Sequence, residues 1–275
     1  MQDWIEKGCV YIPGEETEKI AEKTAEYGAY VFGVGYERND DFPGAFFNTC
    51  FIMDPNGKIL SKYRRFHTIA VSPDDILDEF LKKVGWDELF PVADTPLGKL
   101  AALACGEIRF PEVARMFGMK GVEVLAHCDS SGYPEPGLEA DISPLALAWS
   151  FCRRARAIEN KGYVPRANAG GASEIIDFFG RTLARTQNRG EESIRAPVCM
   201  SLLREAKNEQ QLIRLRGDIF AHLYKELNTW PSNQWKDKIP PLLRQARKEH
   251  RKKAVKRCIE LGILRPEAKG TEGYY

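Results

Sequence analysis

The sequence lacks the features that define several common classes of protein. Its seven cysteines have no regular spacing and no Cys-x-x-Cys pair, so neither a zinc site nor a disulfide framework is predicted. No apolar run approaches the roughly 18 residues of a membrane span. The polar residues 1–8 have no apolar core like that of a signal peptide. We therefore expect a protein of the reducing cytoplasm that does not bind a membrane.

The net charge is also too small to indicate a partner. Forty Lys and Arg residues against 39 Asp and Glu residues leave a net charge of +1. Gly33 and Gly35 form a Gly-x-Gly pair without the third glycine or a following helix, so a dinucleotide site is not indicated. We expect neither a cofactor nor a metal. The 275 residues, 43% of them hydrophobic, are enough for one sizeable core.

Helical and strand patterns alternate along the chain. Periodicity and turn signals predict helices at 15–27, 74–84, 110–119, 143–160 and 201–227. They predict strands at 29–36, 46–53, 58–63, 90–94, 99–104, 122–127, 163–169, 174–178, 182–186 and 194–198. This order indicates an α/β protein whose sheets are covered by helices. Periodicity alone does not separate a two-sheet sandwich from a doubly wound sheet.

Residues 244–257 are strongly basic. Such a segment suits nucleic acid or another anionic surface. It also suits the solvated face of a terminal helix that packs through Leu243, Ala246 and Ala254. We favour the second interpretation, because no aromatic residues alternate with the charges to stack on bases. The sequence thus predicts no nucleic-acid partner.

Cys105 is the most informative residue of the chain. It ends the apolar run 99–104, and a helix signal begins near Phe110. At such a strand-to-helix corner a side chain lies at the rim of a sheet, where backbone N–H groups lower a thiol pKa and bind a developing oxyanion. On spacing alone, a buried cysteine that only fills the end of the strand is the slightly favoured interpretation.

The run from Cys105 to Glu112, ending in Arg-Phe-Pro-Glu, resembles the nucleophile segment of the nitrilase, or carbon–nitrogen hydrolase, superfamily. Residues 154–160, followed by Tyr163 and Asn168, are similar to a second family segment. The resemblance covers about residues 11–230. It implies a four-layer αββα sandwich and cleavage of a non-peptide C–N bond in a small amide or nitrile. A Cys thiolate attacks, a Glu carries protons and a Lys stabilises the tetrahedral intermediate.

Two departures from the family pattern stand out. The family's lysine motif corresponds to Lys62-Tyr-Arg-Arg65-Phe-His, so Arg65 occupies the catalytic lysine position. Arginine keeps a fixed cation there but does not readily give up a proton. Lys62, three residues away, is expected to point to a different surface. The family's glutamate precedes the helix that corresponds to 15–27, so we expect the first βαβ unit and its glutamate to be absent.

The candidate site residues follow from these matches. We assign Cys105 and Arg65 to catalysis. Glu107 and Arg109 flank the corner, where either substrate binding or a local ion pair explains them. His127 and Asp129 follow the next strand, where relatives line the substrate pocket, and are assigned to substrate binding.

The resemblance leads to a specific functional expectation. We predict a nitrilase-like hydrolase domain, incomplete at its N-terminus, over 1–230, and a basic helical extension at 231–275 that contacts another subunit in a homodimer or larger oligomer. Turnover by this chain alone is expected to be absent or severely reduced. The alternative is a catalytically inactive nitrilase-like subunit or binding module.

Overall fold

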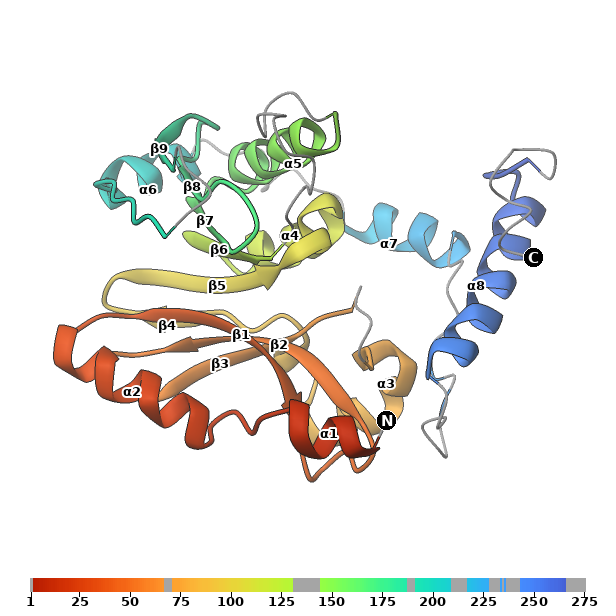
Figure 1. The fold of residues 1–275 in the computed structure, drawn as a ribbon. Coiled ribbons are helices and arrows are strands. Elements are labelled where there is room, and N and C mark those ends of the chain that lie inside the picture. The colour runs from red at the N-terminus through yellow and green to blue at the C-terminus, as the bar shows by residue number, and fades with distance from the viewer. Residues whose placement is uncertain are drawn as a thin grey trace.

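The computed structural model of the chain describes residues 2–66, 71–130, 144–186, 191–208, 217–227, 233, 235 and 243–265. These residues form two stacked sheets (Figure 1). The first is antiparallel, in the order β1 (Val31–Arg38), β2 (Phe46–Met53), β3 (Ile59–Arg64). The second follows the chain order β4 (Ala93–Thr95), β5 (Gly98–Ala104), β6 (Val124–Asp129), β7 (Val164–Asn168), β8 (Glu174–Ile176), β9 (Thr182–Arg185).

Helices cover the outer face of each sheet. Before the first sheet come α1 (Gln2–Gly8) and α2 (Glu15–Tyr27), and α2 ends at Gly28, whose φ of 58° gives the left-handed cap expected of glycine. Against the second sheet lie α4 (Pro111–Met119) and α5 (Pro144–Asn160). The remaining helices are α3 (Leu77–Val84), α6 (Met200–Asn208), α7 (Gly217–Glu226) and α8 (Leu243–Glu260), with 3-10 turns η1 (Pro73–Ile76), η2 (Asp87–Leu89) and η3 (Cys105–Arg109).

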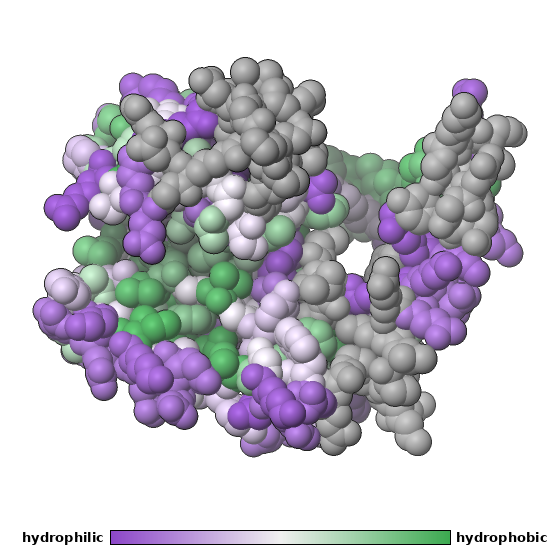
Figure 2. All heavy atoms as spheres, viewed as in Figure 1, coloured by the Kyte–Doolittle hydropathy of each residue, from purple (hydrophilic) through white to green (hydrophobic). Residues whose placement is uncertain are grey.

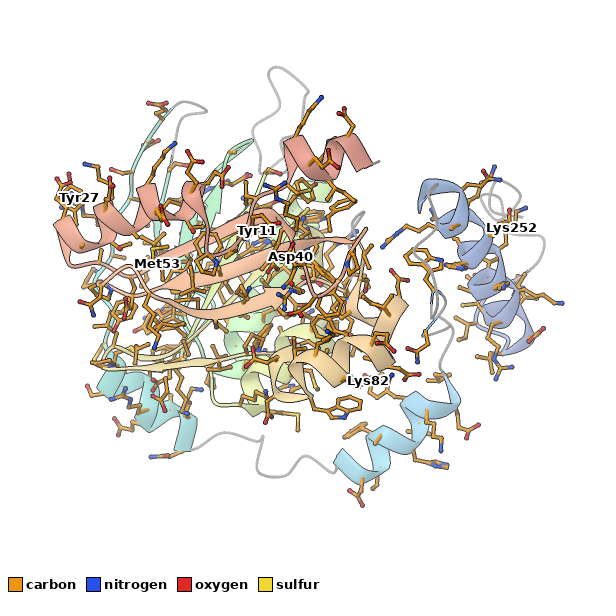
Figure 3. All side chains as sticks on the ribbon, turned by 90° about the horizontal axis from the view of Figure 1, so that it is seen from below. Tyr11, Tyr27, Asp40, Met53, Lys82 and Lys252 are labelled. Carbon is orange, nitrogen blue, oxygen red and sulfur yellow. The ribbon has the colours of Figure 1, made fainter. Side chains whose placement is uncertain are left out.

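Apolar side chains join the layers. Cys50, Ile52 and Tyr63 of the first sheet belong to one buried cluster with the side chains of β5 and β6. Ile20 and Ala21 of α2 pack outside the first sheet, beside Met53, which Figure 3 shows from below. Ala157 of α5 packs against β7 and β8. The predicted αββα sandwich is therefore confirmed, whereas the absence of a first βαβ unit stays a prediction.

The outer edge of β1 pairs with a short piece of chain. The Val10 N–H donates to the Tyr36 carbonyl and the Arg38 N–H donates to the Val10 carbonyl, each at 2.9 Å, which makes a parallel bridge. In Figure 2, hydrophilic residues cover α1 and α2 at the bottom of the molecule, and hydrophobic residues occupy the band above these two helices. Val34 of β1 is 45% exposed.

One sequence prediction in the C-terminal part was wrong, because residues 194–198 form no strand. Within the helix expected at 201–227, α6 runs to Asn208 and α7 begins at Gly217, and residues 209–216 lie outside the described part of the chain. The basic segment does form a helix, α8, whose Ala254 is buried and whose Arg247 pairs with Asp75 at 3.3 Å. Figure 3 places Lys252 of α8 far from Tyr27 of α2. Among the described residues, no helix has the length and apolarity needed to cross a bilayer.

Phe117 of α4 tests the importance of the central cluster. Its ring is fully buried and lies 5.1 Å from Tyr63 and 5.6 Å from Phe90. We expect Phe117→Ala to lower the free energy of unfolding by about 3–5 kcal/mol, because a cavity replaces the ring. Phe220→Ala, at a site on α7 that is 45% exposed, serves as the matched control with an expected change below about 0.5 kcal/mol. Equal losses in urea denaturation would contradict the assigned core.

Candidate active site

Cys105 lies at a strained corner. β5 ends at Ala104, and η3 begins at Cys105 with a φ of 53°. This left-handed conformation is uncommon for a residue other than glycine, costs about 1–3 kcal/mol, and clusters at functional sites. The side chain is half-buried, so the structure does not sequester the thiol in the core.

The other cysteines have different surroundings. Cys9, Cys50 and Cys128 are buried, and burial raises the pKa of the Cys9 and Cys128 thiols to about 11 and that of Cys50 well above its usual value. Cys199 is exposed, and the hydroxyl of Ser201 lowers its pKa. The buried thiols are therefore poor nucleophiles, and Cys199 is the thiol that a general alkylating reagent reaches most easily.

The carboxylate of Glu107 is the centre of a buried network. Glu107 has no exposed surface and accepts hydrogen bonds from the Tyr63 hydroxyl at 2.9 Å and the Phe66 N–H at 3.0 Å. It also accepts a bond from Arg65 Nε at 3.3 Å. Burial and the Glu107 charge raise the pKa of Tyr63, which keeps the phenol a donor. These contacts favour a role in holding the turn rather than in touching substrate.

Arg65 therefore lies at the same corner as Cys105. Its guanidinium is 8% exposed and pairs with Glu107, two residues beyond the thiol. Arg109 stays on the outer side of this corner: it is exposed, its Nε donates to the Gly106 carbonyl at 3.3 Å, and its guanidinium lies 5.0 Å above the Trp149 ring. Both predicted cations thus flank the turn that begins at Cys105.

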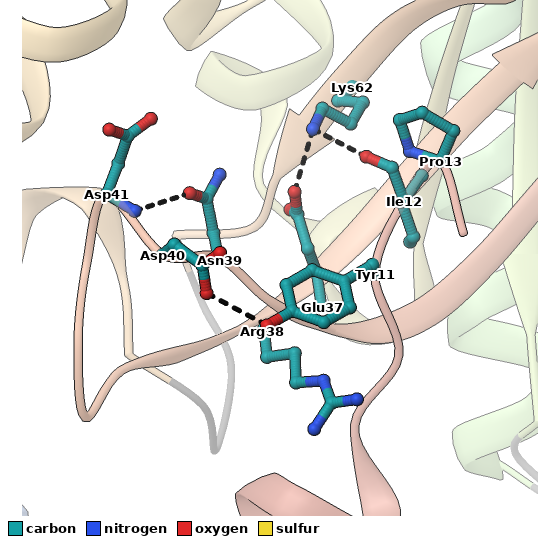
Figure 4. A pocket seen from close by; sticks show the side chains of 9 residues that line it. All are labelled: Tyr11, Ile12, Pro13, Glu37, Arg38, Asn39, Asp40, Asp41 and Lys62. Carbon is teal, nitrogen blue, oxygen red and sulfur yellow. Dashed lines mark hydrogen bonds and ion pairs between the residues drawn. The ribbon is translucent and has the colours of Figure 1, made fainter. Parts of the chain in front are cut away.

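Lys62 points elsewhere, as expected from the alternation of side chains along β3. Its ammonium donates to Glu37 at 2.9 Å and to the Ile12 carbonyl at 2.7 Å (Figure 4). These residues line a separate pocket of about 220 Å³. Burial opposes the ionisation of Glu37, but Arg64 and Lys62 outweigh it and lower the pKa of this carboxyl. Lys62 therefore does not replace the family's lysine at Cys105.

His127 is buried beneath the corner. Its Nε2 lies 2.9 Å from the Cys105 carbonyl oxygen, and its ring is 1% exposed. Burial lowers the pKa of His127 to about 3, so the ring is neutral at physiological pH. A carbonyl only accepts, so Nε2 carries the ring proton. The predicted substrate contact of His127 stays a prediction, whereas its contact with the Cys105 backbone is direct.

Asp129 belongs to a second buried charge network. It accepts hydrogen bonds from Arg166 Nη2 at 2.8 Å and Nε at 3.2 Å, and a neighbouring pair joins Arg153 to Glu174. The sequence analysis did not single out Arg153, Arg166 or Glu174. Arg166 carries a detectable signal, because a cation within an apolar strand needs a buried partner. No group of three or more metal-ligating side chains occurs in the part of the chain that the structure describes.

Comparison with known proteins identifies the family. Residues 3–208 match the carbon–nitrogen hydrolase family. The chain belongs to this family. Omega-amidase NIT2-B of Xenopus laevis is 28% identical over 218 residues, which cover 75% of each protein. Omega-amidase NIT2 of Homo sapiens is 27% identical over 222 residues, which cover 76% of each.

Solved structures of carbon–nitrogen hydrolases share the fold. A carbon–nitrogen hydrolase from Helicobacter pylori G27 aligns with a TM-score of 0.62 and 21% identity, covering 81% of this chain and 77% of that one. Nit3 of Saccharomyces cerevisiae, a member of the nitrilase superfamily, aligns with a TM-score of 0.57 and 20% identity, covering 77% and 76%. The predicted family resemblance is confirmed.

Glu107→Gln tests the network that joins Arg65 to the corner. Removing the negative charge leaves a buried guanidinium without its counter-charge, so we expect the free energy of unfolding to fall by about 3–5 kcal/mol. Glu15→Gln is the control, because Glu15 is exposed and contributes little, with an expected change below about 0.5 kcal/mol. Urea denaturation of the two variants gives the comparison, and similar values for both would refute the structural role of Glu107.

The depressed pKa of His127 predicts a pH dependence of stability. The ring titrates near 6.5 in the unfolded chain and near 3 in the folded one. Below pH 6.5 the unfolded chain therefore binds a proton that the folded chain does not, and stability falls as pH decreases. Between pH 6.5 and 5, the free energy of unfolding should fall by up to about 1.4 kcal/mol per pH unit more in the natural protein than in His127→Gln. Parallel pH profiles would contradict the neutral, buried ring.

Proposed function

We propose that this carbon–nitrogen hydrolase acts on a small amide, with the Cys105 thiolate as the attacking group. Relatives named omega-amidases support an amide as the substrate. The observation that carries the assignment is the half-buried thiol on a left-handed residue at the end of β5, next to the buried Arg65–Glu107 pair. A nitrile is the other substrate class that the same chemistry accepts.

The proposed reaction begins with acylation. The thiolate sulfur attacks the amide carbon, and the fixed positive charge of Arg65 stabilises the oxyanion that forms. The intermediate collapses when the leaving nitrogen takes a proton from water, which breaks the C–N bond, releases ammonia and leaves a thioester on Cys105. Water then hydrolyses the thioester to a carboxylic acid and restores the thiol.

Protonation of the leaving nitrogen needs a proton donor and attack by water needs a base, and the ionisable side chains described next to Cys105 are engaged in other contacts. Glu107 is held by Tyr63, Phe66 and Arg65, and its charge balances a buried guanidinium. His127 is neutral, and its Nε2 proton is donated to a backbone carbonyl. We therefore propose slow deacylation, because water attacking the thioester has little general-base assistance.

An ammonia burst tests this proposal. Mixing the protein with a panel of small primary amides should release about one equivalent of ammonia per chain from the preferred substrate, followed by a much slower steady phase. Cys105→Ala should abolish both phases, and Cys199→Ala should retain both because Cys199 is exposed and its backbone N–H donates to the Tyr163 hydroxyl, outside the contacts of the corner. Intact-mass measurement should detect the acyl adduct on Cys105. Rapid multiple turnover would refute slow deacylation, and no adduct with any amide or nitrile would refute the nucleophile.

The alternative proposal is a non-catalytic subunit or binding module. Arg65 favours it, because it stands where the family resemblance implies a lysine. The same burst experiment decides between the two, since a binding module gives saturable binding of the amide without ammonia or an adduct. Assembly into a homo-oligomer and a cytoplasmic location stay predictions. Exposed apolar side chains on α5, such as Phe151 and Ile158, support the assembly into a homo-oligomer.

A further inference from the structure

Cys105 occupies a backbone conformation that its residue type disfavours. A φ of 53° places its Cβ against the following carbonyl, a strain that glycine avoids. Such a conformation persists only where the surrounding structure fixes it. A hydrogen bond from a neighbouring side chain to the Cys105 carbonyl is one contact that can fix this conformation.

His127 contacts that carbonyl from the adjacent strand. β5 and β6 are parallel, with Leu103 paired to His127, so the imidazole lies beside the end of β5. Its Nε2 donates to the Cys105 carbonyl at 2.9 Å. The opposite ring nitrogen, Nδ1, is buried and has no hydrogen-bond partner among the described residues. The buried ring thus directs its one donor to the backbone of Cys105.

The charges around the ring keep this donor in place. Asp129, Arg153 and Arg166 face His127 with opposing effects on its protonation, and burial keeps the ring neutral. A neutral imidazole has a single N–H, and the carbonyl requires it on Nε2. Since Nε2 is committed in this way, the ring does not take the thiol proton from that atom.

We propose that His127 is a positioning residue, which holds Cys105 in its left-handed conformation through the Nε2–H to carbonyl bond and thereby sets the sulfur at the rim of the sheet. The proposal rests on the proposed role of Cys105 as nucleophile and adds a residue that orients it. The donated hydrogen bond, rather than the volume of the ring, is the property that matters.

Two variants separate the bond from the volume. His127→Met fills similar space without a donor, and His127→Gln keeps an N–H near the position of Nε2. Iodoacetamide alkylation, followed by peptide mass spectrometry, gives the rate constants of Cys105 and of the exposed Cys199 in the same molecule. We expect Cys105 to react at least fivefold more slowly in His127→Met and within twofold of the natural rate in His127→Gln, with Cys199 unchanged in both. An unchanged Cys105 rate in His127→Met, or equal losses in both variants, overturns the proposal.

A second measurement covers the case in which His127→Met unfolds. Cys105→Gly adopts the left-handed conformation without strain, so the bond from His127 matters less there. His127→Met should therefore shift the melting temperature of the Cys105→Gly chain by at most half of its effect on the natural chain. If His127→Met alone does not fold, the double variant must fold. An equal shift in both backgrounds, or an unfolded double variant, refutes the positioning role.

Neither readout uses amide turnover. A protein that forms no acyl adduct but shows the alkylation pattern above loses the proposed function and keeps the positioning role. If His127→Met forms the acyl adduct as readily as the natural protein, the proposed function stands and the positioning role of His127 is refuted.

Discussion

The carboxylate of Glu107 is the contact on which the candidate site depends. It joins the segment that follows β3 in the first sheet to the turn that follows β5 in the second. The two sheets pack through apolar side chains, which are tolerant of small sliding movements. A buried carboxylate with three directional donors tolerates far less, so it fixes where the strand ends meet. Arg65 and Cys105 are brought to one corner as a consequence.

This arrangement also explains how an arginine is accommodated at position 65. The guanidinium has several N–H groups in a fixed plane, and its Nε is used to bind Glu107. A lysine ammonium is a point charge with three rotatable donors on one nitrogen. It therefore has no separate atom, like the arginine Nε, that anchors the side chain while other nitrogens carry the charge outward. Arginine therefore combines an anchored position with a permanent charge, and gives up the ability to exchange a proton. Under the proposed function, the consequence is a site better equipped to stabilise an oxyanion than to move protons.

Much of the fold could be predicted from the sequence, because local patterns determine it. Helix α2 has the predicted bounds 15–27, and its Gly28 cap is readable from residue type alone. The hairpin of β2 and β3 follows from the turn residues at 55–57. Residues 194–198 show where local patterns fail to predict a strand. A short apolar run forms a strand only if a neighbouring strand offers an edge with which it can pair.

The site was less predictable, because its partners are distant in the sequence. Cys105 and Arg65 were found through motif resemblance, and the structure brings their segments together through Glu107, 42 residues from Arg65. The contact between His127 and the Cys105 carbonyl depends on the register of β5 and β6, which no spacing rule supplies. The buried pairs of Asp129 with Arg166 and of Arg153 with Glu174 depend likewise on the adjacency of β6, β7 and β8 with α5.

The buried charges beneath the corner impose a further constraint on its chemistry. Removing ions from water is costly, so each buried cation here is matched by a buried carboxylate, as Arg65 is by Glu107 and Arg166 by Asp129. The oxygens of these carboxylates already accept hydrogen bonds from buried donors of the protein. The features that make the corner rigid and hold the strained Cys105 backbone thus also withhold these carboxylates from proton transfer. Orientation of the thiol and activation of the thiol are separate requirements, and the described residues satisfy the first more fully than the second.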